Sequence, residues 1–173
     1  MRTKLILFAT MLVCLLLQCS LLPAISIASI TPNLMIVFTV SFGLMRGKRS
    51  GLLLGFVCGL LTDLMLPDLF VGLRAFVYMF IGYFSGYCYH IFYDEDIKMP
   101  VLLTAAGDFV YGCLFYITKF LLRGRIDLFY YIRRIILPEM IYTILLTIIC
   151  YRIFLLLNQK LEKMDKRSVG SFV

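Results

Sequence analysis

Residues 43–72 read GLMRGKRSGLLLGFVCGLLTDLMLPDLFVG, and we expect the chain to be organised around this stretch. Glycine recurs at every fourth position from 43 to 59, and the next step of four reaches Asp63. Because residues four apart share one face of a helix, Gly51, Gly55 and Gly59 form a small face that leads to an acid. In lipid, such a face lets another helix backbone approach closely, and a carboxylate on it points at protein. We predict that the rest of the chain packs around this hairpin.

A basic knot, formed by Arg46, Lys48 and Arg49, interrupts the apolar sequence and divides the glycine row between two helices. We expect this basic knot and the basic tail 158–173 to meet anionic headgroups or cytoskeletal partners. Gly82 and Gly86 supply a second small face further along the chain. The two small faces either pack against each other, which we favour, or dock a partner's helix.

The composition indicates an integral membrane protein. The chain has 173 residues, of which 62% are hydrophobic, and its mean hydropathy is +0.95. Soluble domains carry about 45–50% apolar residues. The net charge of +7 does not indicate nucleic-acid binding, because the basic residues cluster at the ends of apolar runs rather than on one polar surface.

The apolar runs predict an all-α fold, a six-helix transmembrane bundle that forms one domain over residues 1–173. The predicted spans cover about 5–22, 33–45, 50–66, 70–92, 99–122 and 135–157. Between them we expect a bent outer segment at 23–32, a tight turn at Pro67-Asp68, a polar loop at 94–98 and an interfacial segment at 123–134.

The distribution of Lys and Arg predicts the orientation. With six spans, ten of these residues lie on the side of both termini and four lie on the other side. Basic residues favour the cytoplasm, so we expect both termini there, in a bacterial cell membrane. The four outer arginines all lie in 123–134. They either contact a partner or outer headgroups, or simply cap the fifth and sixth spans.

Asp63, Arg74, Asp108, Lys119 and Glu139 fall inside the predicted spans, and each should face protein or water. We predict two ion pairs at matching depth, Asp63–Arg74 and Lys119–Glu139. Asp108 has no obvious cation, so it is either protonated or bonded to Tyr or Thr hydroxyls. The charges could line a polar cavity or a proton path. We favour the view that they hold helix hairpins together, because paired charges at one interface need no transported ion.

No catalytic motif is present: the sequence has no HExxH, GxSxG or phosphate-binding loop. The six cysteines lie within apolar segments and form no CxxC pair, and His90 is the single histidine. We therefore expect no catalytic, metal or cofactor residues, and we predict that the protein is not an enzyme. A membrane-embedded hydrolase would need a nucleophile–base pair or a metal set that the chain lacks.

The pattern resembles the rod shape-determining protein MreD family of bacteria. The likeness covers roughly 32–90, and Asn33 stands where the family usually has aspartate. The matching residues are Pro32-Asn33-Leu34, Gly43, Arg46-Gly47, Gly51, Gly55, Gly59-Leu60, Asp63, Gly72-Leu73, Gly82-Tyr83 and Gly86.

The resemblance implies a non-enzymatic scaffold subunit of the machinery that elongates the peptidoglycan wall. Its implied partners are MreC, the RodA glycosyltransferase, a class B penicillin-binding protein and, indirectly, MreB. The implied fold is similar to that of the substrate-binding subunits of energy-coupling-factor transporters. The alternative is therefore a small-molecule-binding membrane subunit of such a vitamin transporter, which would place several polar residues around an outer pocket.

Overall fold

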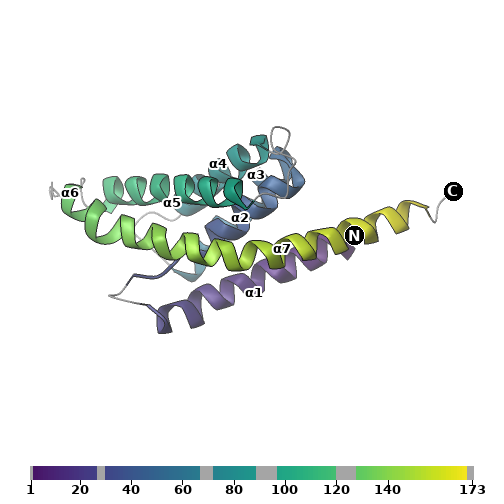
Figure 1. Cartoon of the computed structure of the whole chain (residues 1–173), viewed down its shortest axis with the longest axis horizontal. Coiled ribbons are helices and arrows are strands. Elements are labelled where there is room, and N and C mark those ends of the chain that lie inside the picture. The colour runs from purple at the N-terminus through teal and green to yellow at the C-terminus, as the bar shows by residue number, and fades with distance from the viewer. Residues whose placement is uncertain (1, 27–29, 67–71, 89–96, 120–127, 171–173) are drawn as a thin grey trace.

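The computed structural model describes residues 2–26, 30–66, 72–88, 97–119 and 128–170, except for the side chains at 2, 119, 128 and 165–170. The described residues are almost entirely helical, so the predicted all-α fold is confirmed (Figure 1). The elements are α1 (Arg2–Ala24), α2 (Leu34–Arg46), α3 (Lys48–Met65), α4 (Leu73–Tyr87), α5 (Lys98–Lys119), α6 (Leu128–Tyr131), the π-helical turn η3 (Ile132–Ile136) and α7 (Leu137–Gly170). The predicted turn at Pro67-Asp68 and His90 lie outside the described residues.

Three helical stretches in the described residues are long and apolar enough to cross a membrane. They are Thr3–Ala24, Lys98–Thr118 and Phe129–Met164. Helix α2 is a shorter apolar helix of 13 residues. At 1.5 Å per residue it measures about 20 Å, against about 30 Å for the hydrocarbon core of a bilayer. The three long stretches support a membrane protein, and the arrangement with six spans stays a prediction.

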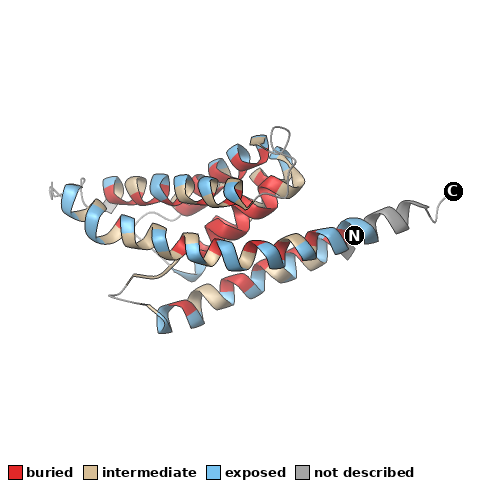
Figure 2. Cartoon of the chain, in the orientation of Figure 1, coloured by how far each residue is buried: buried red, intermediate tan, exposed pale blue. Residues whose placement is uncertain are grey.

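Helix α2 forms the centre of the molecule. Every residue from Leu34 to Leu44 is buried, and Figure 2 shows this helix in red between partly exposed neighbours. The prediction that the chain packs around residues 43–72 is wrong, because α2 lies at the centre and α3 packs on one side of it together with α4. A helix too short to match the bilayer is best accommodated inside a bundle, where protein rather than lipid surrounds its ends.

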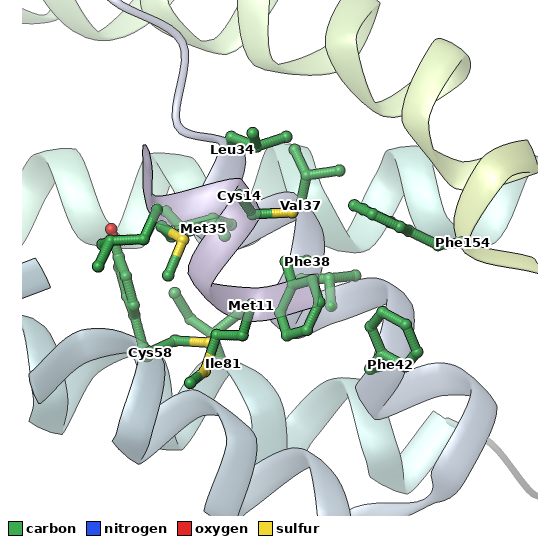
Figure 3. Close-up of a cluster of buried hydrophobic side chains, with 14 of the residues drawn as sticks. Met11, Cys14, Leu34, Met35, Val37, Phe38, Phe42, Cys58, Ile81 and Phe154 are labelled. Atoms are coloured by element: carbon green, nitrogen blue, oxygen red, sulfur yellow. The ribbon is translucent and has the colours of Figure 1, made fainter. Parts of the chain in front are cut away.

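Side chains from α1, α3, α4, α5 and α7 pack around those of α2 in one core, part of which is drawn in Figure 3. The rings of Phe38 and Phe42 each lie 5.6 Å from the ring of Phe154 on α7, measured between centroids. Met11 on α1 and Ile81 on α4 are buried in the same cluster. Such contacts join segments far apart in the sequence through one continuous apolar core.

Helices α1 and α7 lie side by side, and the start of α1 and the end of α7 lie at the same end of the molecule (Figure 1). The sixth predicted span ends at about residue 157, and the helix α7 continues beyond it to Gly170. The residues after Asn158 are good helix formers such as Lys, Glu and Gln. Leu161 is only 2% exposed, so this part of α7 still belongs to the packed core.

The predicted small faces meet each other across α3 and α4. A Cβ atom added to Gly51 would fall on the carbonyl oxygen of Gly82, and one added to Gly55 would fall on that of Tyr78. A Cβ added to Gly86 would in turn meet the Lys48 backbone. The two backbones are thus in direct contact, which only glycine permits at these positions. The glycine row serves internal packing in this structure rather than a partner's helix.

We expect the substitution Gly55→Ala to destabilise the protein. Alanine normally stabilises a helix relative to glycine by about 1 kcal/mol, but here the new methyl group meets a backbone carbonyl that cannot move alone. Overpacking of this kind costs about 1–3 kcal/mol. Thermal unfolding in detergent measures the difference.

Gly107→Ala is the matched control, because its Cβ would meet only the flexible Ile81 side chain, at 3.1 Å. We expect a much smaller change in that variant. A Gly55→Ala protein as stable as the parent chain would contradict the close contact between α3 and α4.

Candidate functional site

The predicted pair of Asp63 and Arg74 is present at one end of the α3–α4 hairpin. Arg74 Nη1 lies 3.5 Å from Asp63 Oδ1, and the two side chains are 10% and 3% exposed. Both charges are therefore removed from solvent and depend on each other and on nearby polar groups.

Asp63 also closes the beginning of α4. Its Oδ2 accepts hydrogen bonds from the backbone N–H groups of Gly72, at 2.9 Å, and Ala75, at 3.2 Å. These N–H groups have no partner within the helix, and a negative charge is favourable at a helix N-terminus. The N-cap residue Gly72 has a φ angle of 99° and no side chain, so an acid from α3 performs the capping.

Arg74 performs the reciprocal task at the end of α3. Its Nη1 donates a hydrogen bond of 2.6 Å to the carbonyl oxygen of Leu66, the C-cap residue of α3. Its Nε donates to the Tyr111 hydroxyl on α5 at 3.2 Å, and its guanidinium carbon lies 5.0 Å from the centroid of the Phe115 ring. The pair thus joins both helix ends of the hairpin and ties them to α5, as the structural interpretation of these charges requires.

A second polar cluster surrounds Asn33 at the start of α2. Its Oδ1 accepts hydrogen bonds from the N–H of Ile36, at 3.3 Å, and from the Tyr78 hydroxyl, at 3.0 Å. Its own N–H donates to Thr143 Oγ1 on α7 at 3.2 Å. Asn33 therefore caps α2 and connects it to two other helices.

Gln18 on α1 binds both neighbours of Asn33. Its Nε2 donates to the Pro32 carbonyl at 3.1 Å, and its Oε1 accepts from the Leu34 N–H at 2.7 Å. We did not single out Gln18, Tyr78, Tyr111 or Thr143 from the sequence. Each is an isolated polar residue inside an apolar span. In lipid such a residue needs a partner on another helix, and this feature of the sequence could have identified them.

Asp108 is the least satisfied acid in the described part of the chain. It is 2% exposed, and neither carboxylate oxygen accepts a hydrogen bond from the described residues. The Thr143 side chain on α7 lies beside the carboxylate. The Thr104 hydroxyl, one helical turn away on α5, donates no hydrogen bond there either. Glu139 on α7 is half-buried. The Lys119 side chain lies outside the described residues, so the Lys119–Glu139 pair stays a prediction.

The basic knot lies at the other end of the hairpin. Arg46 Nε donates to Asn158 Oδ1 on α7 at 2.9 Å, and Asn158 Nδ2 donates to Glu162 Oε1 at 2.8 Å. Lys48 and Arg49 are exposed. One of the three basic side chains therefore holds α2 to α7, and the other two remain at the surface.

The polar side chains of the described residues serve the contacts between helices. The described residues contain no group of three or more His, Cys, Asp or Glu side chains that could hold a metal ion. The polar groups that the structure brings together, Asp63 with Arg74 and Asn33 with Tyr78, bind helix ends and helix neighbours. The arrangement therefore determines how the helices pack against one another.

We expect Asp63→Ala to unfold or strongly destabilise the protein, because it leaves the Arg74 charge buried without its anion and α4 without its cap. Removing one partner of a buried pair costs about 3–5 kcal/mol. Thermal unfolding and the level of protein in the membrane measure the effect.

Two further variants test the cause. Asp63→Asn keeps an oxygen that accepts from Gly72 and Ala75, so its loss of stability should be smaller. Replacing both charges, Asp63→Ala with Arg74→Leu, should recover part of the loss. An Asp63→Ala protein of normal stability that has lost a transport activity would instead support a polar cavity.

Comparison with known proteins identifies the family of the chain. The chain matches the family described as rod shape-determining protein MreD over residues 1–161 of its 173. Searches of curated proteins and of solved structures returned no match. The match extends well beyond residues 32–90, which carry the sequence likeness, and it covers α1 to α6, η3 and α7 as far as Leu161. The chain therefore belongs to the MreD family of rod shape-determining proteins.

Proposed function

We propose that this protein is a non-enzymatic scaffold subunit of the bacterial elongation complex, which helps to position cell-wall synthesis and so maintains cell shape. The observation that carries the proposal is the family match over residues 1–161. The partner that we propose is MreC, and through it RodA, a class B penicillin-binding protein and, indirectly, MreB.

The geometry supports a scaffold, because its polar side chains are used to fix helices. Asp63 binds the first turn of α4, Arg74 contacts α3 and α5, and Asn33 contacts α4 and α7. A rigid bundle can hold a partner's membrane segment at a fixed orientation. We further propose that the protein spans the cell membrane several times with both termini in the cytoplasm. The common position of the start of α1 and the end of α7 supports this (Figure 1).

The surface that we propose for a partner's transmembrane helix is the apolar groove between α4 and α5. Its volume is about 470 Å³, and its lining includes Phe80 and Phe84 together with the small residues Ser85, Ala106 and Gly107. Small residues allow a helix to approach closely in lipid. The glycine row of α3 is not free for this role, because it already packs on α4.

A transporter subunit is the second candidate, and the unpaired Asp108 carboxylate favours it. A buried acid with a free hydroxyl beside it, here Thr104, is the kind of polar group that a small-molecule pocket uses. Retention of a vitamin by the purified protein would decide for this candidate.

Depletion of the protein in its rod-shaped host tests the scaffold function. We expect the cells to become round, because the elongation complex loses the subunit that positions it, and we expect vitamin uptake to remain normal. Microscopy of cell width and uptake of labelled vitamin measure both outcomes. Cells that stay rod-shaped after depletion would contradict the proposal.

Photo-crosslinking in living cells tests the partner surface. A photoreactive residue at Phe80 or Ala106 should capture a membrane partner, with MreC expected, because both positions line the groove. The same residue at Leu60 is the control, because that side chain is 42% exposed on α3, outside the groove. Equal capture from both positions would contradict the groove as a docking surface.

A further inference from the structure

The segment from α6 through η3 is anchored on one side to α5. The ring of Tyr131 lies 4.9 Å from the ring of Tyr116, measured between centroids. Ile136 is 2% exposed and fills the space beside Gly112, where an added Cβ would come within 3.0 Å of the Ile136 side chain. These two contacts pack the segment against α5.

The π-helical turn explains how this anchoring works. The N–H of Leu137 donates to the carbonyl of Ile132, five residues back, where an α-helix would bond four residues back. In the wider turn, residues five apart come close to one face, so both Tyr131 and Ile136 face α5. The residues between them are left on the outer side. Such turns occur frequently at functional sites.

That outer side carries two arginines and two aromatic rings around a hollow of about 460 Å³. Phe129 is 77% exposed and Tyr130 is 59% exposed, and Arg133 and Arg134 complete the lining. The guanidinium carbon of Arg134 lies 5.6 Å from the centroid of the Tyr130 ring. Neither arginine has an ion-pair partner among the described residues.

The chemistry of this hollow matches one kind of ligand. Two guanidinium groups present paired N–H donors that fit the oxygens of a phosphate. Aromatic side chains settle at the boundary between headgroups and acyl chains. A free anion would use the arginines alone, whereas a phospholipid also offers apolar surface to Phe129 and Tyr130.

We propose that the hollow lined by Phe129, Tyr130, Arg133 and Arg134 binds the headgroup of an anionic phospholipid. The two arginines donate to its phosphate, and the two rings contact the glycerol and the beginning of the acyl chains. Phospholipid phosphates line both surfaces of a membrane, so this site depends neither on the proposed scaffold function nor on the orientation of the chain.

Native mass spectrometry of the purified full chain tests the proposal, with phosphatidylglycerol as the probe and phosphatidylcholine for comparison. We expect the protein to retain phosphatidylglycerol preferentially. The double substitution Arg133→Gln with Arg134→Gln should reduce that retention about a hundredfold, because each charge-assisted hydrogen bond contributes about a factor of ten. Arg133→Lys with Arg134→Lys should bind at an intermediate level, because the charge remains without the forked geometry.

The matched control is Lys4→Gln with Lys98→Gln, which removes two exposed charges at the starts of α1 and α5, outside the hollow, the basic knot and the basic tail. We expect it to retain lipid as the parent chain does. Equal loss in both double variants would show general charge attraction and overturn the site. The proposal would also be overturned if the protein retained the two lipids equally, or if the lysine variant retained lipid as well as the parent chain does. It would be overturned as well if millimolar inorganic phosphate displaced the bound lipid as effectively as added phosphatidylglycerol does. The lysine variant keeps the test decisive if the glutamine variant does not fold.

Discussion

The structure depends on one constraint: a polar group within a membrane protein must find its partner inside the protein. The Asp63–Arg74 pair shows how the chain meets this constraint. Each residue satisfies the end of the opposite helix, through the N–H groups of Gly72 and Ala75 and the carbonyl of Leu66. Two helix ends and two charges, each costly alone, are thus satisfied together. The hairpin between α3 and α4 is held at this point.

Close packing and polar bonding support each other along the hairpin. Glycines allow α3 and α4 to touch along their lengths, and this contact brings Asp63 to the first turn of α4. A larger residue at Gly59 would meet the backbone of Arg74 and Ala75, next to the pair itself. The residues spaced by four from Gly51 to Asp63 therefore act together. The glycines set the distance between the α3 and α4 backbones, and Asp63 binds the first turn of α4 where that contact ends.

The same logic extends to the centre of the bundle. Helix α2 is too short to cross a bilayer alone, and its first residues are held by Gln18, Tyr78 and Thr143 from three different helices. These bonds surround the Pro32-Asn33-Leu34 segment and fix where α2 begins. Asp108 is the exception, since neither of its oxygens is satisfied within the described residues.

The sequence alone determined the helical class, the order of the helices, the small faces and the Asp63–Arg74 pair. These features are local or depend on neighbours in a hairpin, so periodicity and a short turn suffice to predict them. Only the tertiary structure decided that α2 occupies the centre, that α7 continues to Gly170, and that Asn33 binds Tyr78 and Thr143. An apolar helix gives no sequence signal that separates a lipid-facing position from a central one, because lipid and protein interior are equally apolar. Contacts between residues 33 and 143 likewise depend on how distant helices pack, which no local pattern records.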